Sequence, residues 1–291
     1  MGVTYGDEAL VALLRTGAQR RDIDAAILSV LHINAKELSK RWHLAIHQAY
    51  DPLLASTHSL TEQAKPVLQA RGPTDGDYYL APALSPDGKQ AIFFSDRNLF
   101  SIDLFLADAV TGEVKKRLTK TDRDQHFQSL EFINSAGVWD HSGHRFAFTA
   151  VAAAKPVLTI YDVDAGHIVR EIQLPKLAEV YNPTWSPDGK QIAFSGLAGG
   201  FLDIYSYDLA ADSLRQLTND PYTDLQPSWS PDGRTIAFST DRFNSSLPGL
   251  RFGANQLGFL DPAPGEIPKA VPDSASRASR GKQITPQLSP H

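Results

Sequence analysis

Trp185-Ser-Pro-Asp-Gly-Lys-Gln-Ile-Ala-Phe194 returns 44 residues later as Trp229-Ser-Pro-Asp-Gly-Arg-Thr-Ile-Ala-Phe238. A long self-match at such a period indicates a repeat architecture, and it decides the fold more firmly than any local motif. Two weaker copies precede it, Leu84-Ser-Pro-Asp-Gly-Lys-Gln-Ala-Ile-Phe93 and Trp139-Asp-His-Ser-Gly-His-Arg-Phe-Ala-Phe148. The last residues, Thr285-Pro-Gln-Leu-Ser-Pro-His291, match the opening of a fifth copy. We therefore expect this chain to be a piece of a longer array.

Each copy combines a tight turn with short strands. In Ser-Pro-Asp-Gly, proline presets φ at the first corner, aspartate suits the second, and glycine closes a type I turn. The residues behind the turn, 191–195 and 235–239, are β-branched and aromatic, which is typical of strands. Third strands are expected at 103–108, 158–162 and 203–208, and fourth strands at 116–119 and 215–218. Four strands joined in this way over about 40–45 residues predict one blade of a β-propeller.

The turn residues and tryptophans recur in phase, and we interpret them as structural. The aspartates resemble a repeated acidic ligand set, but each stands where a turn favours aspartate. The tryptophans are expected to fill equivalent positions between blades, because such aromatic side chains pack cores more often than they bind ligands. These repeat positions are Pro86, Asp87, Gly88, Trp139, Trp185, Pro187, Asp188, Gly189, Trp229, Pro231, Asp232 and Gly233.

Residues 1–59 have a helical pattern and no strand signal. A first helix is expected over 7–14, with Gly17 as its stop, and a second over 22–31. A third opens at 34–37, where Asn-Ala-Lys-Glu is spaced like a capping box. Its apolar stripe, which predicts a packed face, is Leu38, Trp42, Ala45, Ile46 and Ala49.

Length and composition limit the classes of function. A chain of 291 residues with 42% hydrophobic content can bury a substantial core. We expect two domains, a helical segment at 1–59 and a propeller at 78–291, joined by a Pro- and Gly-rich linker at 60–77. The 28 basic and 33 acidic residues give a net charge of −5 without a basic stripe, which argues against nucleic-acid binding. The chain has no cysteine for disulfide or thiolate chemistry, and no apolar run approaches the roughly 18 residues of a membrane span.

The repeat pattern resembles the propeller repeat of the TolB family. The matching pattern is Pro-x-Trp-Ser-Pro-Asp-Gly-Lys-x-Ile-Ala-Phe, then Asp-Ile-Tyr-x-x-Asp-Leu, then Leu-Thr, and it covers roughly residues 78–268. The second copy departs from it, with Asp140-His141-Ser142 in place of Ser-Pro-Asp. In that family the repeats close a six-bladed ring, whereas about four blades and a stub are visible here. The resemblance implies a mainly β fold, an incomplete TolB-like propeller preceded by helices.

The helical segment resembles the C-terminal end of a gluzincin-type (peptidase MA-like) metallopeptidase domain. The matching stretches are Tyr5-Gly-Asp-Glu-Ala-Leu10 and Glu37-Leu-Ser-Lys-Arg-Trp-His43. Ser239-Thr-Asp-Arg-Phe243 and Leu250-Arg-Phe-Gly253 also resemble the propellers that follow such domains in a group of bacterial proteins. The resemblance implies a fragment of a bacterial protein of the periplasm or cell envelope, a location that no targeting residue in the sequence itself shows.

We expect no catalytic, cofactor-binding or metal-binding residue in this chain. A peptidase of that clan needs His-Glu-x-x-His, and none of the nine histidines is followed by Glu. His43 and His47 have the spacing of a metal-binding pair, but without the Glu or a third ligand we interpret them as surface histidines. The sequence also has no Gly-x-Ser-x-Gly, no Gly-x-x-x-x-Gly-Lys and no Gly-x-Gly-x-x-Gly.

These patterns favour a non-catalytic propeller that binds a protein or peptide partner, because propellers present loops on a rigid scaffold. That inference rests on fold alone. The alternative is a zinc metallopeptidase whose catalytic half is missing from this chain, and a third possibility is an inert truncated product. Residues 262–284 are expected to form a surface loop between blades four and five. We also expect the terminal blades, which lack a neighbour on one face, to exchange amide hydrogens faster than the third blade.

Overall fold

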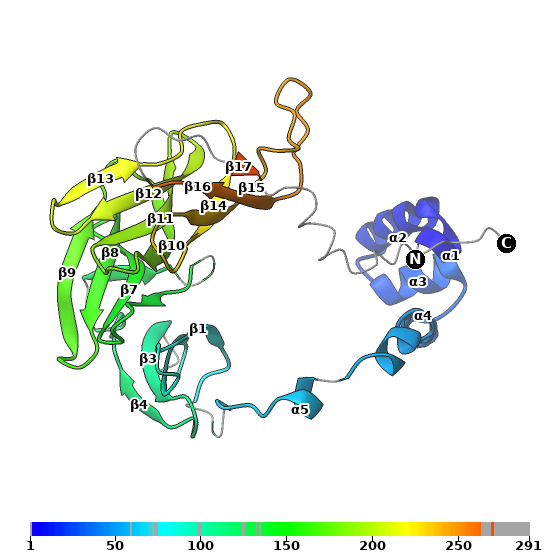
Figure 1. The fold of residues 1–291 in the computed structure, drawn as a ribbon. Helices are drawn as coiled ribbons and strands as arrows, with labels where there is room; N and C mark the ends of the chain where they lie inside the picture. The colour runs from blue at the N-terminus through cyan, green and yellow to red at the C-terminus, as the bar shows by residue number, and fades with distance from the viewer. Residues whose placement is uncertain are drawn as a thin grey trace. The chain divides into compact units, whose positions relative to one another are not determined.

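Four antiparallel sheets follow one another along the second part of the chain (Figure 1). We call them blade 1 (β1–β4), blade 2 (β5–β9), blade 3 (β10–β13) and blade 4 (β14–β17). Their strands are β1 Tyr79–Leu84, β2 Gln90–Ser95, β3 Asp103–Asp108, β4 Val114–Arg117, β5 Phe127–Leu130, β6 Val138–Trp139, β7 Arg145–Ala152, β8 Lys155–Asp162, β9 His167–Gln173, β10 Glu179–Trp185, β11 Gln191–Ala198, β12 Phe201–Asp208, β13 Ser213–Gln216, β14 Asp224–Trp229, β15 Ile236–Thr240, β16 Gln256–Leu260 and β17 Lys269–Ala270. The mainly β class and the four-bladed propeller arrangement after a helical segment are confirmed.

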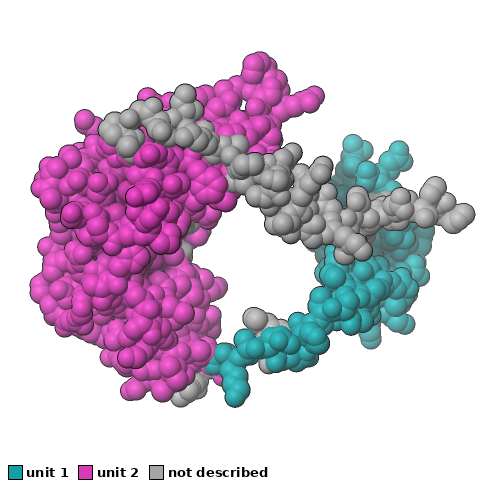
Figure 2. Space-filling model, viewed as in Figure 1, with its two compact units in different colours: residues 1–66 teal, residues 67–291 magenta. Residues whose placement is uncertain are grey.

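The computed structural model describes residues 2–58, 60–69, 72, 75–97, 101–123, 126–131, 133, 135–262 and 269–270. They divide into two compact units, Met1–Pro66 and Val67–His291 (Figure 2). The expected fifth repeat at 285–291 lies outside the described residues, as does most of the expected loop at 262–284. Lys269–Ala270 of that stretch form β17, the outer strand of blade 4.

The innermost strand of three blades carries the same irregularity. Its register with the second strand shifts between Leu80 and Ala83, between Tyr181 and Thr184, and between Leu225 and Ser228. The first of the two residues inside each shift has a positive φ: Ala81, Asn182 and Gln226. Such bulges bend a strand and increase its twist, so the recurring bulge aims each inner strand in the same way. The strand pattern did not predict this bulge.

Apolar clusters lie between successive blades. One core joins blades 1 and 2 around Phe94 and Phe148, a second joins blades 2 and 3 around Phe194, and a third joins blades 3 and 4 around Phe238. Strand β11 is buried on both faces over Ile192–Gly196, because it has a blade on each side. Burial on two faces is what makes these central strands nearly continuous apolar runs.

The two terminal blades differ in how their outward faces are covered. In blade 1, Leu68 packs against Phe93 and Phe105 on the face turned away from blade 2. The expectation that this face has no cover is therefore wrong, because a residue before the first strand shields it. In blade 4, strand β15 alternates instead between buried and half-buried residues, and Leu257 on β16 is exposed.

We expect strands β14–β16 of blade 4 to exchange their amide hydrogens faster than strands β10–β12 of blade 3, because only one face of blade 4 is covered within the described chain. Blade 1 should fall between them. Hydrogen exchange followed by mass spectrometry of peptides from each blade tests this order. Equal protection of blades 3 and 4 in a monomer would contradict it.

The first unit consists of helices α1 Gly2–Tyr5, α2 Asp7–Arg20, α3 Ile23–Leu31, α4 Ala35–Ala55 and α5 Leu60–Gln63. Helix α2 passes through Gly17 and ends at Arg20, with Arg21 in the left-handed conformation, so the predicted stop at Gly17 is wrong. Gly17 suits a close contact instead, since a Cβ there would lie 3.4 Å from Ile23 of α3. None of the described helices is long and apolar enough to cross a membrane.

Helix α4 begins as predicted, but of its expected apolar stripe Leu38 packs against the core of this unit while Trp42, Ala45, Ile46 and Ala49 are exposed. The Asn34 side chain accepts a hydrogen bond from the Glu37 amide at 2.8 Å, which is the expected cap. The Glu37 carboxylate pairs with Arg41. No residue of α4 is buried, and Trp42 in its apolar stripe is 61% exposed. The small core of this unit is built from α2 and α3, around Leu13, Ala26, Ile27 and Leu31.

Candidate functional site

The aspartates of the Ser-Pro-Asp-Gly turns are engaged by their own turns. In blade 3, the Ser186 hydroxyl donates to Asp188 at 2.7 Å, and the Lys190 amide donates to the same carboxylate oxygen at 3.1 Å. Blades 1 and 4 repeat both bonds at Asp87 and Asp232. These hydrogen bonds, the serine's first, lower the pKa of each aspartate. The glycines that follow, Gly88, Gly189 and Gly233, have φ near +70°.

Blade 2 makes the same turn with donor and acceptor exchanged. Asp140 takes the position of the serine, and Ser142 takes the position of the aspartate. The Ser142 hydroxyl donates to Asp140 at 2.7 Å, so the serine–aspartate bond is kept in reverse. Asp140 is buried, and its carboxylate also accepts from the Arg145 side chain at 2.8 Å. The second copy is therefore an inverted form of the turn.

The three in-phase tryptophans occupy equivalent positions but differ in burial. Trp139 and Trp185 are 6% and 4% exposed, whereas Trp229 is half-buried. The Trp139 indole donates to the Ala83 carbonyl of the preceding blade at 2.9 Å, and the Arg145 guanidinium lies 4.6 Å from the ring of Trp185. Trp229 packs against the core between blades 3 and 4 and also forms part of the wall of a cleft.

That cleft, of about 580 Å³, lies between the turns of blades 3 and 4. Its walls include the repeat positions Pro187, Asp188, Trp229, Asp232 and Gly233. The charged groups around it are Asp188, Asp232 and Asp261 with Arg215 and Arg234. The structure thus brings repeat residues from two blades together into one concave, charged surface. The repeat residues of blade 1, Pro86, Asp87 and Gly88, do not belong to it, and neither does Pro231.

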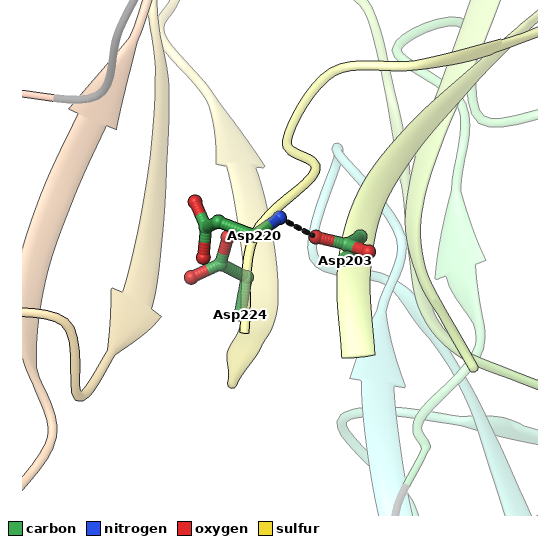
Figure 3. A group of neighbouring side chains, drawn as sticks. All are labelled: Asp203, Asp220 and Asp224. Atoms are coloured by element: carbon green, nitrogen blue, oxygen red, sulfur yellow. Dashed lines mark hydrogen bonds between the residues drawn. The ribbon is translucent and has the colours of Figure 1, made fainter. Parts of the chain in front are cut away.

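A second polar group lies where the third strand of blade 3 and the first strand of blade 4 begin (Figure 3). Asp203 comes from β12, Asp224 opens β14, and Asp220 lies in the connection before it. One carboxylate oxygen from each lies within 4.8 Å of the others. The Asp220 amide donates to Asp203 at 3.4 Å. Arg242 binds both of the other carboxylates, Asp220 at 2.7 Å and Asp224 at 2.5 Å.

Burial and the neighbouring charges shape the titration of this group. Burial, first of all, raises the pKa of Asp203, and the charges of Asp224 and Asp220 raise it further. The pKa of Asp224 is also raised, by burial, although hydrogen bonds from Thr240 and Arg242 oppose the shift. Among the described residues, oxygen Oδ1 of Asp224 is buried and has no hydrogen-bond partner. Hard cations favour carboxylate oxygens, but a bound cation would share this space with the Arg242 guanidinium.

Asp103 occupies in blade 1 the position of Asp203 in blade 3. Both are buried near the start of their third strands, Asp103 as the first residue of β3 and Asp203 as the third residue of β12. Each accepts from a threonine hydroxyl, Thr119 or Thr218. The outer strand supplies Arg117 to Asp103 at 2.5 Å, but Gln216 to Asp203. Burial raises the pKa of Asp103, but hydrogen bonds from Thr121, Ser101, Thr119 and Arg117 outweigh it, and the pKa is lowered overall.

The two aspartates are therefore expected to respond in opposite ways to removal of their charge. Because the pKa of Asp103 is lowered, its ionised form stabilises the fold at pH values above the ordinary pKa near 3.8. This stability is lost as the pH falls through the lowered pKa. Because the pKa of Asp203 is raised, the folded protein loses stability as the pH rises from the ordinary pKa near 3.8 through the raised pKa. At pH 7 we expect Asp103→Asn to lower the free energy of unfolding by about 1–3 kcal/mol, and Asp203→Asn to leave it unchanged or raise it. Urea denaturation at pH 7 and pH 4.5 measures the free energy of unfolding of both variants. Equal losses of stability in the two variants at pH 7 would contradict this prediction.

The histidine pair on α4 is engaged within its own helix. His43 Nδ1 lies 2.7 Å from the Ser39 carbonyl, and His47 Nδ1 lies 3.0 Å from the Asp51 carboxylate. Neither histidine belongs to the group of three potential ligands found among the described residues, which consists of Asp203, Asp220 and Asp224. The expectation that this chain binds no metal stays a prediction. The sequence pattern did not predict the group of Asp203, Asp220 and Asp224. Its one signal was the aspartate that recurs near the start of the third strand, which is Asp203 in blade 3.

The second unit is similar to known TolB propellers. Residues 127–246 match the family model of the TolB β-propeller domain. Among solved structures, TolB from Acinetobacter baumannii has a TM-score of 0.55 and 24% identity, with 71% of this chain and 45% of that chain covered. The putative TolB from Agrobacterium tumefaciens has a TM-score of 0.51 and 19% identity, with 67% of each chain covered. No curated protein matches the sequence.

These findings define the class as a β-propeller, and within that class the second unit is a TolB-like propeller. The chain spans less than half the length of the Acinetobacter protein. The likeness shows the fold, so activity and partners are matters for proposal.

Proposed function

We propose that this chain is a non-catalytic TolB-like propeller that binds a protein or peptide partner through the cleft between the turns of blades 3 and 4. The observation that carries this is the cleft itself, about 580 Å³ with three carboxylates and two guanidinium groups around it. Its walls are turns tied by side-chain hydrogen bonds, so its polar groups are preorganised. Charges of both signs on a rigid surface suit an extended peptide with its own polar groups.

The chemistry of the cleft supports binding rather than catalysis. Ser186 is the one hydroxyl side chain among the described residues that line it, and this hydroxyl donates to Asp188. No histidine, lysine or cysteine is among those lining residues to activate it. The pKa of Asp188 and that of Asp232 are lowered, which keeps these groups ionised rather than poised for proton transfer.

A random peptide library displayed on phage and selected on the immobilised chain tests this proposal. Arg234 is an exposed cleft residue, so Arg234→Glu should weaken binding of the selected peptides by about tenfold without unfolding the protein. Lys89→Glu is the matched control, because Lys89 holds the same position after the turn of blade 1. Failure to select any peptide, or equal binding by both variants, would overturn the proposal.

We also propose, from the resemblance of the helical segment, that the propeller belongs to a larger bacterial envelope protein. The rival proposal is a zinc metallopeptidase in which this propeller admits substrates to a catalytic domain outside the present sequence. The full gene product distinguishes them, since a His-Glu-x-x-His motif upstream of residue 1 favours the enzyme.

A further inference from the structure

The junctions between blades share one basic position. Lys116 on β4, Arg170 on β9 and Arg215 on β13 pair with equivalent residues of the strand beside them, Leu106, Ile160 and Ser206. Arg170 reaches the next blade and donates to the Leu209 carbonyl at 2.6 Å, and Arg215 likewise donates to the Pro262 carbonyl. Each outer strand thus directs a cation toward the turn between the third and fourth strands of the following blade.

Between blades 2 and 3 this cation meets a carboxylate of the chain itself. Asp212 lies in the turn of blade 3, and its Oδ1 accepts from the Tyr207 hydroxyl at 2.5 Å and from Arg170. The guanidinium of Arg170 also lies 5.9 Å from the Tyr207 ring. Hydrogen bonds from Tyr207 and Arg170 lower the pKa of Asp212 and hold it ionised. A cation, a phenol and a carboxylate therefore form one closed set.

Between blades 1 and 2 the cation and the phenol are kept, but the carboxylate is missing. Tyr161 holds the position of Tyr207, one residue before the aspartate that ends the third strand, and Lys116 holds that of Arg170. Gly166 stands where blade 3 has Asp212, four residues after the strand-ending aspartate. Both residues have a positive φ, +77° and +51°.

The cation and the phenol of this junction lie beside Gly166, where blade 3 has its carboxylate. A Cβ placed on Gly166 would lie 2.2 Å from Lys116 Nζ and 3.9 Å from the Tyr161 hydroxyl. Tyr161 is 4% exposed, and within the described chain neither its hydroxyl nor the Lys116 ammonium has a hydrogen-bond or ion-pair partner. Burial raises the pKa of Tyr161, so the phenol remains a donor at neutral pH.

This position opens into a cleft of about 440 Å³ with a strong local charge. The described residues that line it include Lys116, Arg117, Lys120 and Arg123, and none of these lining residues is acidic. Asp103 and Asp122 neutralise Arg117, and Asp122 also lies 3.6 Å from Arg123. Among the described residues, no carboxylate pairs with Lys116 or Lys120. In a chain whose net charge is −5, this cleft should therefore attract anions against the overall field.

We propose that the cleft between blades 1 and 2 binds a carboxylate of a ligand in the place that Asp212 fills between blades 2 and 3. Lys116 and the Tyr161 hydroxyl hold the carboxylate, while Lys120 supplies charge at the rim. The carboxylate belongs either to a small organic acid or to an acidic peptide side chain. This site is separate from the cleft between blades 3 and 4, and it does not depend on the function proposed there.

Gly166→Asp tests the proposal directly, because it supplies the missing carboxylate within the chain. Asp212 shows that aspartate tolerates this backbone conformation, and the displaced group is the flexible end of Lys116. Gly199→Asp is the matched control, since Gly199 also has a positive φ but a Cβ there meets nothing within 4 Å. We expect Gly166→Asp to melt at a higher temperature than Gly199→Asp.

Binding is measured by ligand-observed NMR with two probes, succinate and acetyl-Gly-Asp-Gly-amide, against the acetyl-Gly-Asn-Gly-amide control. We expect Gly166→Asp and Lys116→Met to weaken carboxylate binding by about tenfold or more, as for loss of a charge-assisted hydrogen bond, and Gly199→Asp to leave it unchanged. Binding of succinate alone identifies a site for small acids, and binding of the aspartyl peptide alone identifies a site for peptides. Binding of neither probe, or equal binding by wild type and Gly166→Asp, would overturn the proposal.

Discussion

Replacing Trp185 with alanine is expected to lower the free energy of unfolding by about 3–5 kcal/mol, the range for truncating a large buried aromatic side chain. Trp185 is 4% exposed in the core that joins blades 2 and 3. Arg145 of blade 2 stacks on its ring at 4.6 Å, so truncation also removes a contact across the junction. Part of the cost is the cavity, because the strands on each side are held by their own ladders and cannot collapse into it.

Two other tryptophans calibrate this result. Trp229→Ala should cost roughly half as much, because Trp229 is half-buried. Trp42→Ala should change stability by no more than about 0.5 kcal/mol, because this ring on α4 is 61% exposed. Urea denaturation followed by circular dichroism measures all three variants. A Trp185→Ala protein as stable as Trp42→Ala would show that the ring does not hold blades 2 and 3 together.

The repeat pattern was enough to predict the blades, because the information for a blade is local. A Ser-Pro-Asp-Gly turn and two flanking apolar strands satisfy their hydrogen bonds within about 20 residues. Thus β3 was predicted at its observed bounds, Asp103–Asp108, and β12 within two residues of its start. The second blade was judged degenerate because a pattern of letters cannot show that Asp140 and Ser142 form the same bond in reverse.

Features that depend on contacts between distant residues were not predicted. The apolar stripe of α4 has the period of a packed helix, yet in the described chain only Leu38 of the stripe packs against the helical core and the rest of the stripe is exposed. The aspartate group joins a third strand, a connection and a following first strand, and Arg242 reaches it from the end of β15. That Gly166 stands where blade 3 has a carboxylate can be recognised only from the contacts of Asp212 with Arg170 and Tyr207. Aligning the repeats would have paired Gly166 with Asp212. It would not have shown that Lys116 lies beside Gly166 as Arg170 lies beside Asp212.

The second large effect is expected at Arg242, where Arg242→Leu should lower the free energy of unfolding at pH 7 by about 3–5 kcal/mol. The arginine side chain is 10% exposed and is the cation bound to both Asp220 and Asp224. Asp224 is fully buried, so without the guanidinium its charge has neither water nor a cation to stabilise it. Arg97→Leu is the matched control, since Arg97 follows β2 as Arg242 follows β15 and pairs with a less buried carboxylate, Asp75. It should cost less.

The dependence on pH separates this mechanism from simple loss of packing. Burial already raises the pKa of Asp224, and removal of Arg242 should raise it further, because a cation that favours the charged form is gone. A folded-state pKa above the unfolded value means that the folded protein binds the proton more tightly, so stability is lost as the pH rises through that interval. The deficit of Arg242→Leu should therefore shrink between pH 7 and pH 5, and adding Asp224→Asn should restore part of the stability at pH 7. A deficit that is the same at both pH values, and unchanged by Asp224→Asn, would mean that Arg242 acts through the contacts of its guanidinium with the rings of Phe238 and Tyr222 rather than through the buried carboxylate.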